Sequence, residues 1–361
     1  MKGKTPTRGL SLGGVFLLLL IVYLLVTKTY PIDFSQNALS KVQNPVFESE
    51  IIGDMSWDGG DGLYLLDSTE EIQSVDFSGN VLWRKNLDGR HLVWMGPGGF
   101  LTYRENRMEL WDRDGNLLLE KSKFIETPQV LSAEGDFLLI SGKIEQKDCT
   151  ALLSKDGSVI WILAWDGRVV SGFNMGSGMY TVLNLMEEDV TGRMVLIDSL
   201  GQVALEKKYP DLVLCCKVVN QGITAITEEN VFTIDFFGNE KWSLSLEQKD
   251  IYRADIGKSG CIALVVTHKA SALSDKDRFE ILMLSPEGQT LWSYILEDSP
   301  RFVTIEGDFV YIIDDNGMTV LSKQGLLQCN VRQKGISRIE VIDSKRLIIK
   351  YGVNSGLLNL S

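Results

Sequence analysis

Two aspartates and three glycines stand together at Asp58–Gly62 (DGGDG), and such residues supply the oxygen ligands and tight turns of calcium loops. The acidic residues do not continue at the spacing of a calcium loop, so we expect a turn between two strands. The two histidines, His91 and His268, are far apart in the sequence, which disfavours a zinc site. The sequence contains no Gly-x-Ser-x-Gly motif, which would indicate a serine hydrolase. We therefore predict no catalytic residue, no metal site and no cofactor.

Five arginines are the candidates for ligand binding, and each precedes a short apolar segment by seven to ten residues. They are Arg90, Arg168, Arg253, Arg301 and Arg338. If these apolar segments are the second strands of repeated sheets, each arginine lies near the start of an innermost strand, at the rim of a central channel. Clustered guanidinium groups suit an anionic ligand or the acidic segment of a protein partner. The alternative is local pairing with Asp54, Asp211, Asp250 or Asp298.

A repeated hairpin predicts the elements that would position these arginines, and VDFSGNVLW (75–83) is its first copy. Its turn glycine recurs at intervals of 36 to 50 residues, at Gly79, Gly115, Gly157, Gly201, Gly238, Gly288 and Gly325. Asp or Ser stands three residues before each glycine, and an apolar residue stands four residues after it, most often tryptophan (Trp83, Trp161, Trp242, Trp292). Asp or Ser accepts hydrogen bonds from turn amides, glycine adopts a positive φ, and the apolar residue packs between adjacent sheets.

A short apolar segment precedes each hairpin, and an eighth segment of this kind, RLIIKYG, begins at Arg346 near the end of the chain. A repeat of this length suits a blade of four strands. We predict an all-β fold, an eight-bladed β-propeller in which the N-terminal strand, within 38–48, completes the last blade, because an open edge strand invites aggregation. Seven blades with an appended segment are the alternative.

The DxxGxxxW hairpins resemble the repeats of quinoprotein-type (PQQ-like) propellers, a superfamily that includes alcohol dehydrogenases and the propeller subunit of the outer-membrane β-barrel assembly machinery. One apolar N-terminal segment combined with WDGGDGLYLLD (57–67) is similar to an uncharacterised family of single-anchor membrane propellers from Gram-positive anaerobes. The first resemblance implies a PQQ-type oxidoreductase as an alternative, because such enzymes carry adjacent cysteines near the cofactor, as at Cys215–Cys216. We instead expect an inner strand there, with the two thiols on opposite faces.

Residues 10–26 contain no charged side chain, and seventeen residues at about 1.5 Å each span roughly 25 Å, the short end of a membrane crossing. Lys2, Lys4 and Arg8 precede this segment, which places the N-terminus in the cytoplasm. We predict a cytoplasmic tail (1–9), a transmembrane anchor (10–26), a linker (27–37) and an extracytoplasmic propeller (38–361) at the cell membrane. A cleaved signal peptide is the alternative. The five cysteines, an odd number, predict buried thiols rather than a disulfide framework.

The net charge of −12 and the lack of any block of Lys or Arg disfavour nucleic-acid binding. The expected partners are the lipid bilayer, through residues 10–26, and an envelope protein or an anionic ligand. Long connections between second and third strands indicate an interaction face, with Glu188 and Asp275 as candidate contacts. We predict a non-catalytic protein- or ligand-binding module of the cell envelope. The alternatives are a small-ligand sensor and a quinone-dependent or glycan-active enzyme.

Overall fold

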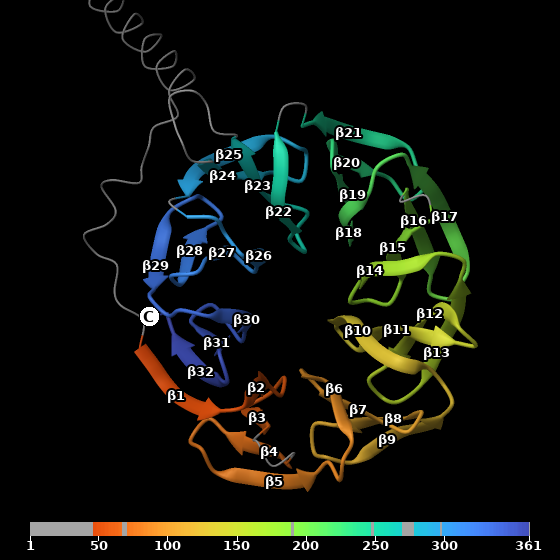
Figure 1. Ribbon diagram of the computed structural model, residues 1–361, viewed down its shortest axis with the longest axis vertical. Coiled ribbons are helices and arrows are strands. Elements are labelled where there is room, and N and C mark those ends of the chain that lie inside the picture. Colours follow the sequence, from red (N-terminus) through yellow and green to blue (C-terminus); the bar gives the residue numbers. More distant parts are fainter. Residues whose placement is uncertain are drawn as a thin grey trace, which may run out of the picture. The chain divides into compact units, whose positions relative to one another are not determined.

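The computed structural model describes residues 46–66, 71–188, 191–246, 249–268, 278–296 and 298–360. These residues form eight antiparallel sheets of four strands each, arranged around a common centre (Figure 1). The fold is therefore all-β, as predicted. Eight sheets of four strands confirm the eight-bladed propeller, and the seven-bladed alternative is wrong.

The innermost strands are β2 (Asp54–Trp57), β6 (His91–Gly96), β10 (Glu126–Glu134), β14 (Arg168–Asn174), β18 (Val213–Val219), β22 (Asp250–Ile256), β26 (Phe302–Glu306) and β30 (Ile336–Val341). The second strands are β3 (Gly62–Leu66), β7 (Gly99–Arg104), β11 (Phe137–Ile144), β15 (Tyr180–Met186), β19 (Gly222–Thr227), β23 (Ile262–His268), β27 (Phe309–Ile313) and β31 (Arg346–Tyr351). The third strands are β4 (Glu71–Asp76), β8 (Arg107–Asp112), β12 (Lys147–Ser154), β16 (Gly192–Asp198), β20 (Asn230–Ile234), β24 (Arg278–Leu284), β28 (Met318–Ser322) and β32 (Asn354–Asn359). The outer strands are β5 (Val81–Asn86), β9 (Leu117–Ser122), β13 (Val159–Trp165), β17 (Val203–Tyr209), β21 (Glu240–Ser245), β25 (Thr290–Leu296), β29 (Leu327–Val331) and β1 (Val46–Ile52).

We number the blades in chain order, from β2–β5 as blade one to β30–β32 with β1 as blade eight. The hairpin turns between third and outer strands, such as 77–80, lie on one face of the ring, which we call the turn face. The turns from innermost to second strands lie on the same face, because neighbouring strands are antiparallel. The opposite face carries the connections from second to third strands and from blade to blade. We call it the insertion face.

The last blade is completed by the strand nearest the N-terminus. β1 pairs antiparallel with β32, and Val46 lies opposite Asn359. The predicted closing segment, 38–48, overlaps this strand only at 46–48, and its other residues lie outside the described part of the chain. Because Asn359 ends β32 on the turn face, the chain enters the propeller from that face.

The hairpin turns are built on the three residues that define the repeat. Their seven glycines have φ between 78° and 94°, a region that glycine adopts without a Cβ clash. In blade one, Asp76 Oδ1 accepts hydrogen bonds from the backbone N–H groups of Ser78 at 2.9 Å and Asn80 at 2.8 Å. Ser285 and Ser322 accept the equivalent bonds in blades six and seven. These contacts confirm the roles predicted for the turn residues.

The tryptophans of the repeat connect each blade to the next one. The indole N–H groups of Trp83, Trp242 and Trp292 donate to a turn carbonyl of the following blade at 2.7–3.0 Å. Trp161 is more deeply buried than these three tryptophans, but its indole N–H has no acceptor. The rings also lie against the turn glycines, since a Cβ atom on Gly288 would be 2.6 Å from the ring of Trp242. The predicted packing between sheets is thereby confirmed.

The DGGDG segment is the turn between β2 and β3. The Asp58 carboxylate accepts hydrogen bonds from the backbone N–H groups of Gly60 at 2.7 Å and Gly62 at 3.2 Å. It therefore serves the turn, as predicted. Among the described residues, no group of three or more His, Cys, Asp and Glu side chains is arranged to hold a metal ion.

The predicted cytoplasmic tail (1–9), anchor (10–26) and linker (27–37) lie outside the described residues. Within the part of the chain that the structure describes, no helix is long and apolar enough to cross a membrane.

Candidate functional site

The five predicted arginines all lie at or near the start of an innermost strand, but their side chains make different contacts. Arg90 Nε forms an ion pair with the buried Glu109 at 2.7 Å. Arg253 Nε donates to the backbone carbonyl of Arg301 at 2.9 Å, and the Arg301 guanidinium lies 3.6 Å from an Asp315 oxygen. Glu109 and Asp315 are not among the predicted partners. Of the predicted ones, Asp54 pairs with Lys350, and Asp298 accepts a hydrogen bond from Asn316.

The remaining two predicted arginines lie in different depressions. Arg338 lines a cavity of about 540 Å³ at the turn-face end of the ring's centre, which we call the channel pocket. Arg168 lines a shallow depression of about 710 Å³ on the insertion face, together with Glu188. The structure thus brings Arg253 and Arg301 together and separates the other arginines. Of the five, only Arg338 lines the channel pocket.

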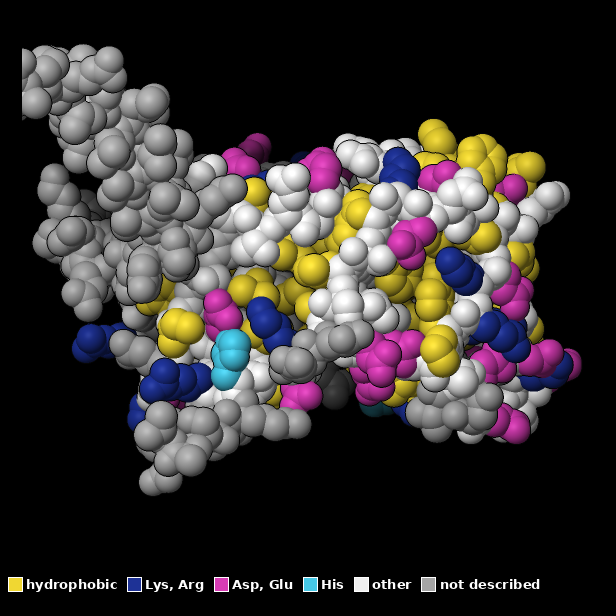
Figure 2. All heavy atoms as spheres, turned by 90° about the horizontal axis from the view of Figure 1, so that it is seen from above, with side chains coloured by type: hydrophobic (Ala, Val, Ile, Leu, Met, Phe, Trp, Pro, Cys, Tyr) yellow, Lys and Arg dark blue, Asp and Glu magenta, His cyan; other side chains and the backbone are white. Residues whose placement is uncertain are grey.

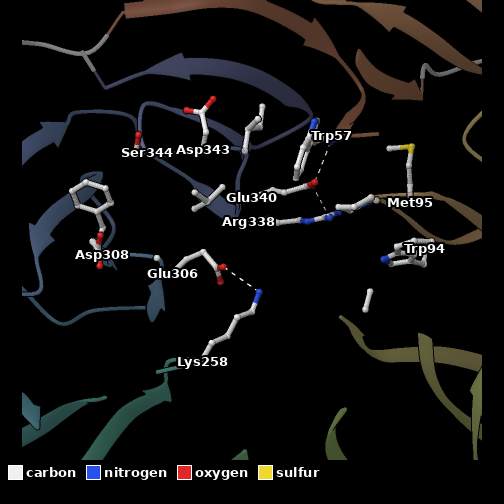
Figure 3. A pocket seen from close by; sticks show the side chains of 17 residues that line it. Trp57, Trp94, Met95, Lys258, Glu306, Asp308, Arg338, Glu340, Asp343 and Ser344 are labelled. Atoms are coloured by element: carbon white, nitrogen blue, oxygen red, sulfur yellow. Dashed lines mark hydrogen bonds and ion pairs between the residues drawn. The ribbon is translucent and has the colours of Figure 1, made fainter. Parts of the chain in front are cut away.

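The channel pocket is formed by the turn-face ends of innermost strands from six blades. The side chains that define it are Trp57, Trp94, Lys258, Glu306, Arg338 and Glu340. Figure 3 shows Arg338 extending across the pocket toward Trp94, and Lys258 reaching toward Glu306. The fold places these residues together because each innermost strand ends at the same face.

The two tryptophans form apolar walls of the pocket. The Trp57 indole N–H donates to the carbonyl of Gly60 at 2.9 Å, which fixes the orientation of its ring. The Trp94 ring lies over Gly96, where a Cβ atom would be 2.9 Å from it. The Trp94 indole nitrogen is turned toward the pocket (Figure 3), and no described residue accepts a hydrogen bond from it. A donor therefore faces the pocket beside an aromatic surface.

Glu340 is the most buried charged group of the pocket, with a side chain 15% exposed. It accepts hydrogen bonds from Ser56 Oγ at 2.7 Å and from the backbone N–H of Trp57 at 3.0 Å. Arg338 Nη2 lies 3.2 Å from Glu340 Oε2, the oxygen that also accepts the hydrogen bond from Ser56. Burial raises the pKa of Glu340, although these hydrogen bonds and the Arg338 charge oppose the rise. Glu340 thus holds Arg338 in place and links blade eight to blade one.

Lys258 makes a second ionic link across the pocket. Its ammonium group lies 2.9 Å from a Glu134 oxygen and 3.3 Å from a Glu306 oxygen. Desolvation disfavours its charge, but the hydrogen bonds and charges of these two carboxylates outweigh that effect and raise the pKa of Lys258. The contact joins blades three, six and seven, so it depends on the closed ring.

Each charged side chain that lines the pocket has an opposite charge beside it. Besides the pairs just described, Asp308 lies 3.4 Å from Lys323 and Asp343 lies 2.8 Å from Arg346. Among the described lining residues there is no cysteine or histidine. The aromatic walls and paired charges are suited to binding an apolar group that carries a polar end.

The predicted interaction face is only partly described. Glu188 is exposed and borders two shallow depressions, of about 700 and 710 Å³. Asp275 lies outside the described residues. Arg168, in the same depression as Glu188, forms no ion pair with a described residue.

The adjacent cysteines have the arrangement expected of an inner strand. Cys216 is buried in the core between blades four and five, whereas Cys215 packs against the core between blades five and six. Burial raises the pKa of Cys215 to about 11 and raises the pKa of Cys216 as well, so both thiols are protonated at neutral pH. All five cysteines are free, and four of them are buried.

Comparisons with known proteins concern the fold alone. No family model matches the sequence, and no curated protein matches it. The structure is similar to that of BamB from Moraxella catarrhalis, with a TM-score of 0.60 and 13% identity over 87% of this chain and 99% of that one. The chain is a β-propeller. Saccharomyces cerevisiae Sqt1 matches with a TM-score of 0.59 and 9% identity over 88% of this chain and 98% of that one. The Dos1 propeller matches with a TM-score of 0.51 and 13% identity over 89% of this chain and 96% of that one.

Sequence reasoning missed five of the six residues that define the pocket. A usable signal existed, because Trp57, Trp94 and Glu340 all stand a few residues before the glycine or turn that opens a second strand. The repeat could therefore have placed these three residues at the turn-face end of the innermost strands. It did not predict that their side chains meet, since Trp57 and Glu340 are at opposite ends of the propeller sequence.

Proposed function

We propose that this protein is a non-catalytic binding module of the cell envelope, held at the extracytoplasmic side of the cell membrane by residues 10–26. The location is supported by the uncharged segment 10–26, by the basic residues before it, and by the resemblance to single-anchor membrane propellers. The DxxGxxxW hairpins support a relationship to quinoprotein-type propellers at the level of the repeat.

The channel pocket is the observation that carries this proposal. Six blades contribute to it, hydrogen bonds to Glu340 join blade eight to blade one, and the ion pairs of Lys258 join blade six to blades three and seven. Such a site is held rigid by the closed ring, and a preformed site loses little conformational freedom on binding.

We propose that the pocket receives an amphipathic group of a protein or ligand. Its apolar part would lie against Trp57 and Trp94, as is usual for anchor residues in aromatic-lined pockets. Arg338 would bind the polar or anionic end, because its five N–H donors make only one hydrogen bond to a described residue, Glu340. The half-exposed guanidinium leaves the other donors accessible.

Photo-crosslinking in the cells that make the protein tests this function. A photoreactive amino acid at Ser344, which is exposed at the edge of the pocket, should give a discrete adduct. The same group at Asn80, in an exposed hairpin turn away from the pocket, is the matched control and should give none. Adducts from a photoreactive group at Glu188 alone would show that the partner binds the insertion face. If neither Ser344 nor Glu188 gives an adduct, docking to a protein is wrong.

A further inference from the structure

The hairpin turns of blades four and five carry a strongly exposed apolar side chain just before the turn glycine, a position that is polar in the other turns. The residue before the turn glycine is polar in five blades, where it is Ser78, Asp114, Asp156, Glu287 and Gln324. In blades four and five it is Leu200, 76% exposed, and Phe237, 87% exposed. Two adjacent blades therefore break the repeat in the same way.

The turn itself does not require these apolar residues. The backbone N–H groups of Leu200 and Phe237 donate to Asp198 and Asp235 at 2.9 Å, the distance at which Ser78 donates to Asp76. A serine thus supports the same turn. Exposed side chains of this size are unfavourable in water, and when they gather on one surface they indicate a site of interaction.

Two further apolar residues of blade four extend this surface. Met179, 56% exposed, lies in the turn before β15, and Val203, 48% exposed, begins β17. The rings of Tyr180 and Phe236 are stacked at 4.6 Å, which joins the turns of the two blades. Figure 2 shows hydrophobic side chains protruding at one corner, on the side where blade four lies in Figure 1. We call Met179, Leu200, Val203 and Phe237 the apolar corner.

The chain enters the propeller from the same face. β1 begins at Val46 beside Asn359, on the turn face, and the uncharged segment 10–26 precedes it in the sequence. The nineteen residues 27–45 between them can span up to about 60 Å at roughly 3.3 Å each. The proposed anchor would therefore keep the apolar corner within reach of the bilayer. A tethered surface needs little affinity of its own, because its effective concentration is high.

We propose that the apolar corner inserts into the lipid bilayer surface and forms a second contact with the membrane, besides the anchor. This inference rests on the proposed membrane anchoring. The side chains stand at the tips of turns rather than in a groove, so a flat lipid surface can receive them without a complementary shape. Hydrogen bonds from Asn239 lower the pKa of Asp235, so this carboxylate stays ionised and limits the insertion to the depth of the side chains.

The contact does not use the channel pocket. Blades four and five contribute no described residue to the lining of the pocket. The apolar corner and the pocket are therefore separate sets of residues on the turn face.

Fluorescence quenching on the full chain in phosphatidylcholine vesicles tests the proposal. A fluorophore on Gln202→Cys reports on the apolar corner, and one on Gln289→Cys is its matched control, because both glutamines directly follow a turn glycine and both are exposed. We expect a spin-labelled lipid to quench the probe at 202 several-fold more than the probe at 289. In the Leu200→Ser/Phe237→Ser variant, quenching at 202 should fall to the level seen at 289.

Three results would overturn the inference. Equal quenching at 202 and 289 in a chain that floats with the vesicles would refute the apolar contact and leave the anchoring intact. A chain that does not float with the vesicles would refute both the anchoring and this contact. Water exposure at 202 in vesicles, combined with a protein crosslink at this position in native membranes, would assign the apolar corner to a protein partner instead.

Discussion

The hairpin turns of seven blades repeat the same kind of hydrogen bond, whereas the channel pocket combines tryptophan, lysine, arginine and glutamate side chains from different blades. The turns use Asp or Ser, glycine and an apolar residue at fixed spacing, and they join each blade to its neighbour. The pocket uses side chains such as Lys258, Arg338 and Glu340, which do not belong to the hairpin repeat. Repeated contacts close the ring, and the positions free from the repeat are available for binding. The two regions should therefore respond differently to substitution.

The largest effect is expected in the ring of turns. Gly288→Ala places a Cβ atom 2.6 Å from the Trp242 ring at a φ of 81°, so we expect the free energy of unfolding to fall by about 2–4 kcal/mol. Gly79→Ala is the matched control, because it has a similar φ of 85° and no atom within 4 Å. It should lose only about 1–2 kcal/mol through backbone strain. Urea denaturation measures both, and equal losses would show that the packing on tryptophan contributes nothing.

The tryptophans themselves sharpen the comparison between blades. Trp242→Phe removes a hydrogen bond of 2.8 Å to the carbonyl of Pro286, whereas Trp161→Phe removes an indole N–H that has no acceptor. We expect Trp242→Phe to cost about 1 kcal/mol more than Trp161→Phe in the same denaturation measurement. A larger cost for Trp161→Phe would mean that the inter-blade bond does not stabilise the ring.

A smaller effect is expected from the pH dependence of Glu340. Its pKa is raised above the ordinary value of 4.5, so the folded protein binds this proton more tightly than the unfolded chain. The corresponding stability is complete below pH 4.5 and is lost as the pH rises through the folded-state pKa. Glu340→Gln should therefore flatten the decline in stability over this window. An unchanged slope in thermal melts between the two proteins would contradict the role of burial at this site.

The sequence predicted the parts of the molecule that depend on local contacts. The turn around Gly79 could be predicted because Asp76, Gly79 and Trp83 act within a few residues of one another. The number of blades followed from counting the apolar segments that become second strands, because these number eight whereas the hairpin turns number seven. The starts of the innermost strands, where the five arginines lie, followed from the same repeat.

The channel pocket could not be predicted in the same way. Lys258 meets Glu134 only because the ring brings blades three and six together, and no local pattern encodes that distance. The repeat also does not predict the direction in which a side chain points, since Arg338 reaches the pocket while Arg168 lies on the insertion face. The transmembrane anchor and its orientation stay predictions.

Substitution of Arg338 tests the central claim, that the channel pocket is the binding site. The yield of the crosslinked adduct at Ser344 would be measured in native cells for Arg338→Gln and for Glu188→Gln, with thermal melts to confirm that both variants fold. We predict that Arg338→Gln lowers the yield roughly tenfold, equivalent to about 1.4 kcal/mol of binding free energy, and that Glu188→Gln leaves it unchanged. A yield that is unaffected by Arg338→Gln but lost in Glu188→Gln would contradict the claim and place binding on the insertion face.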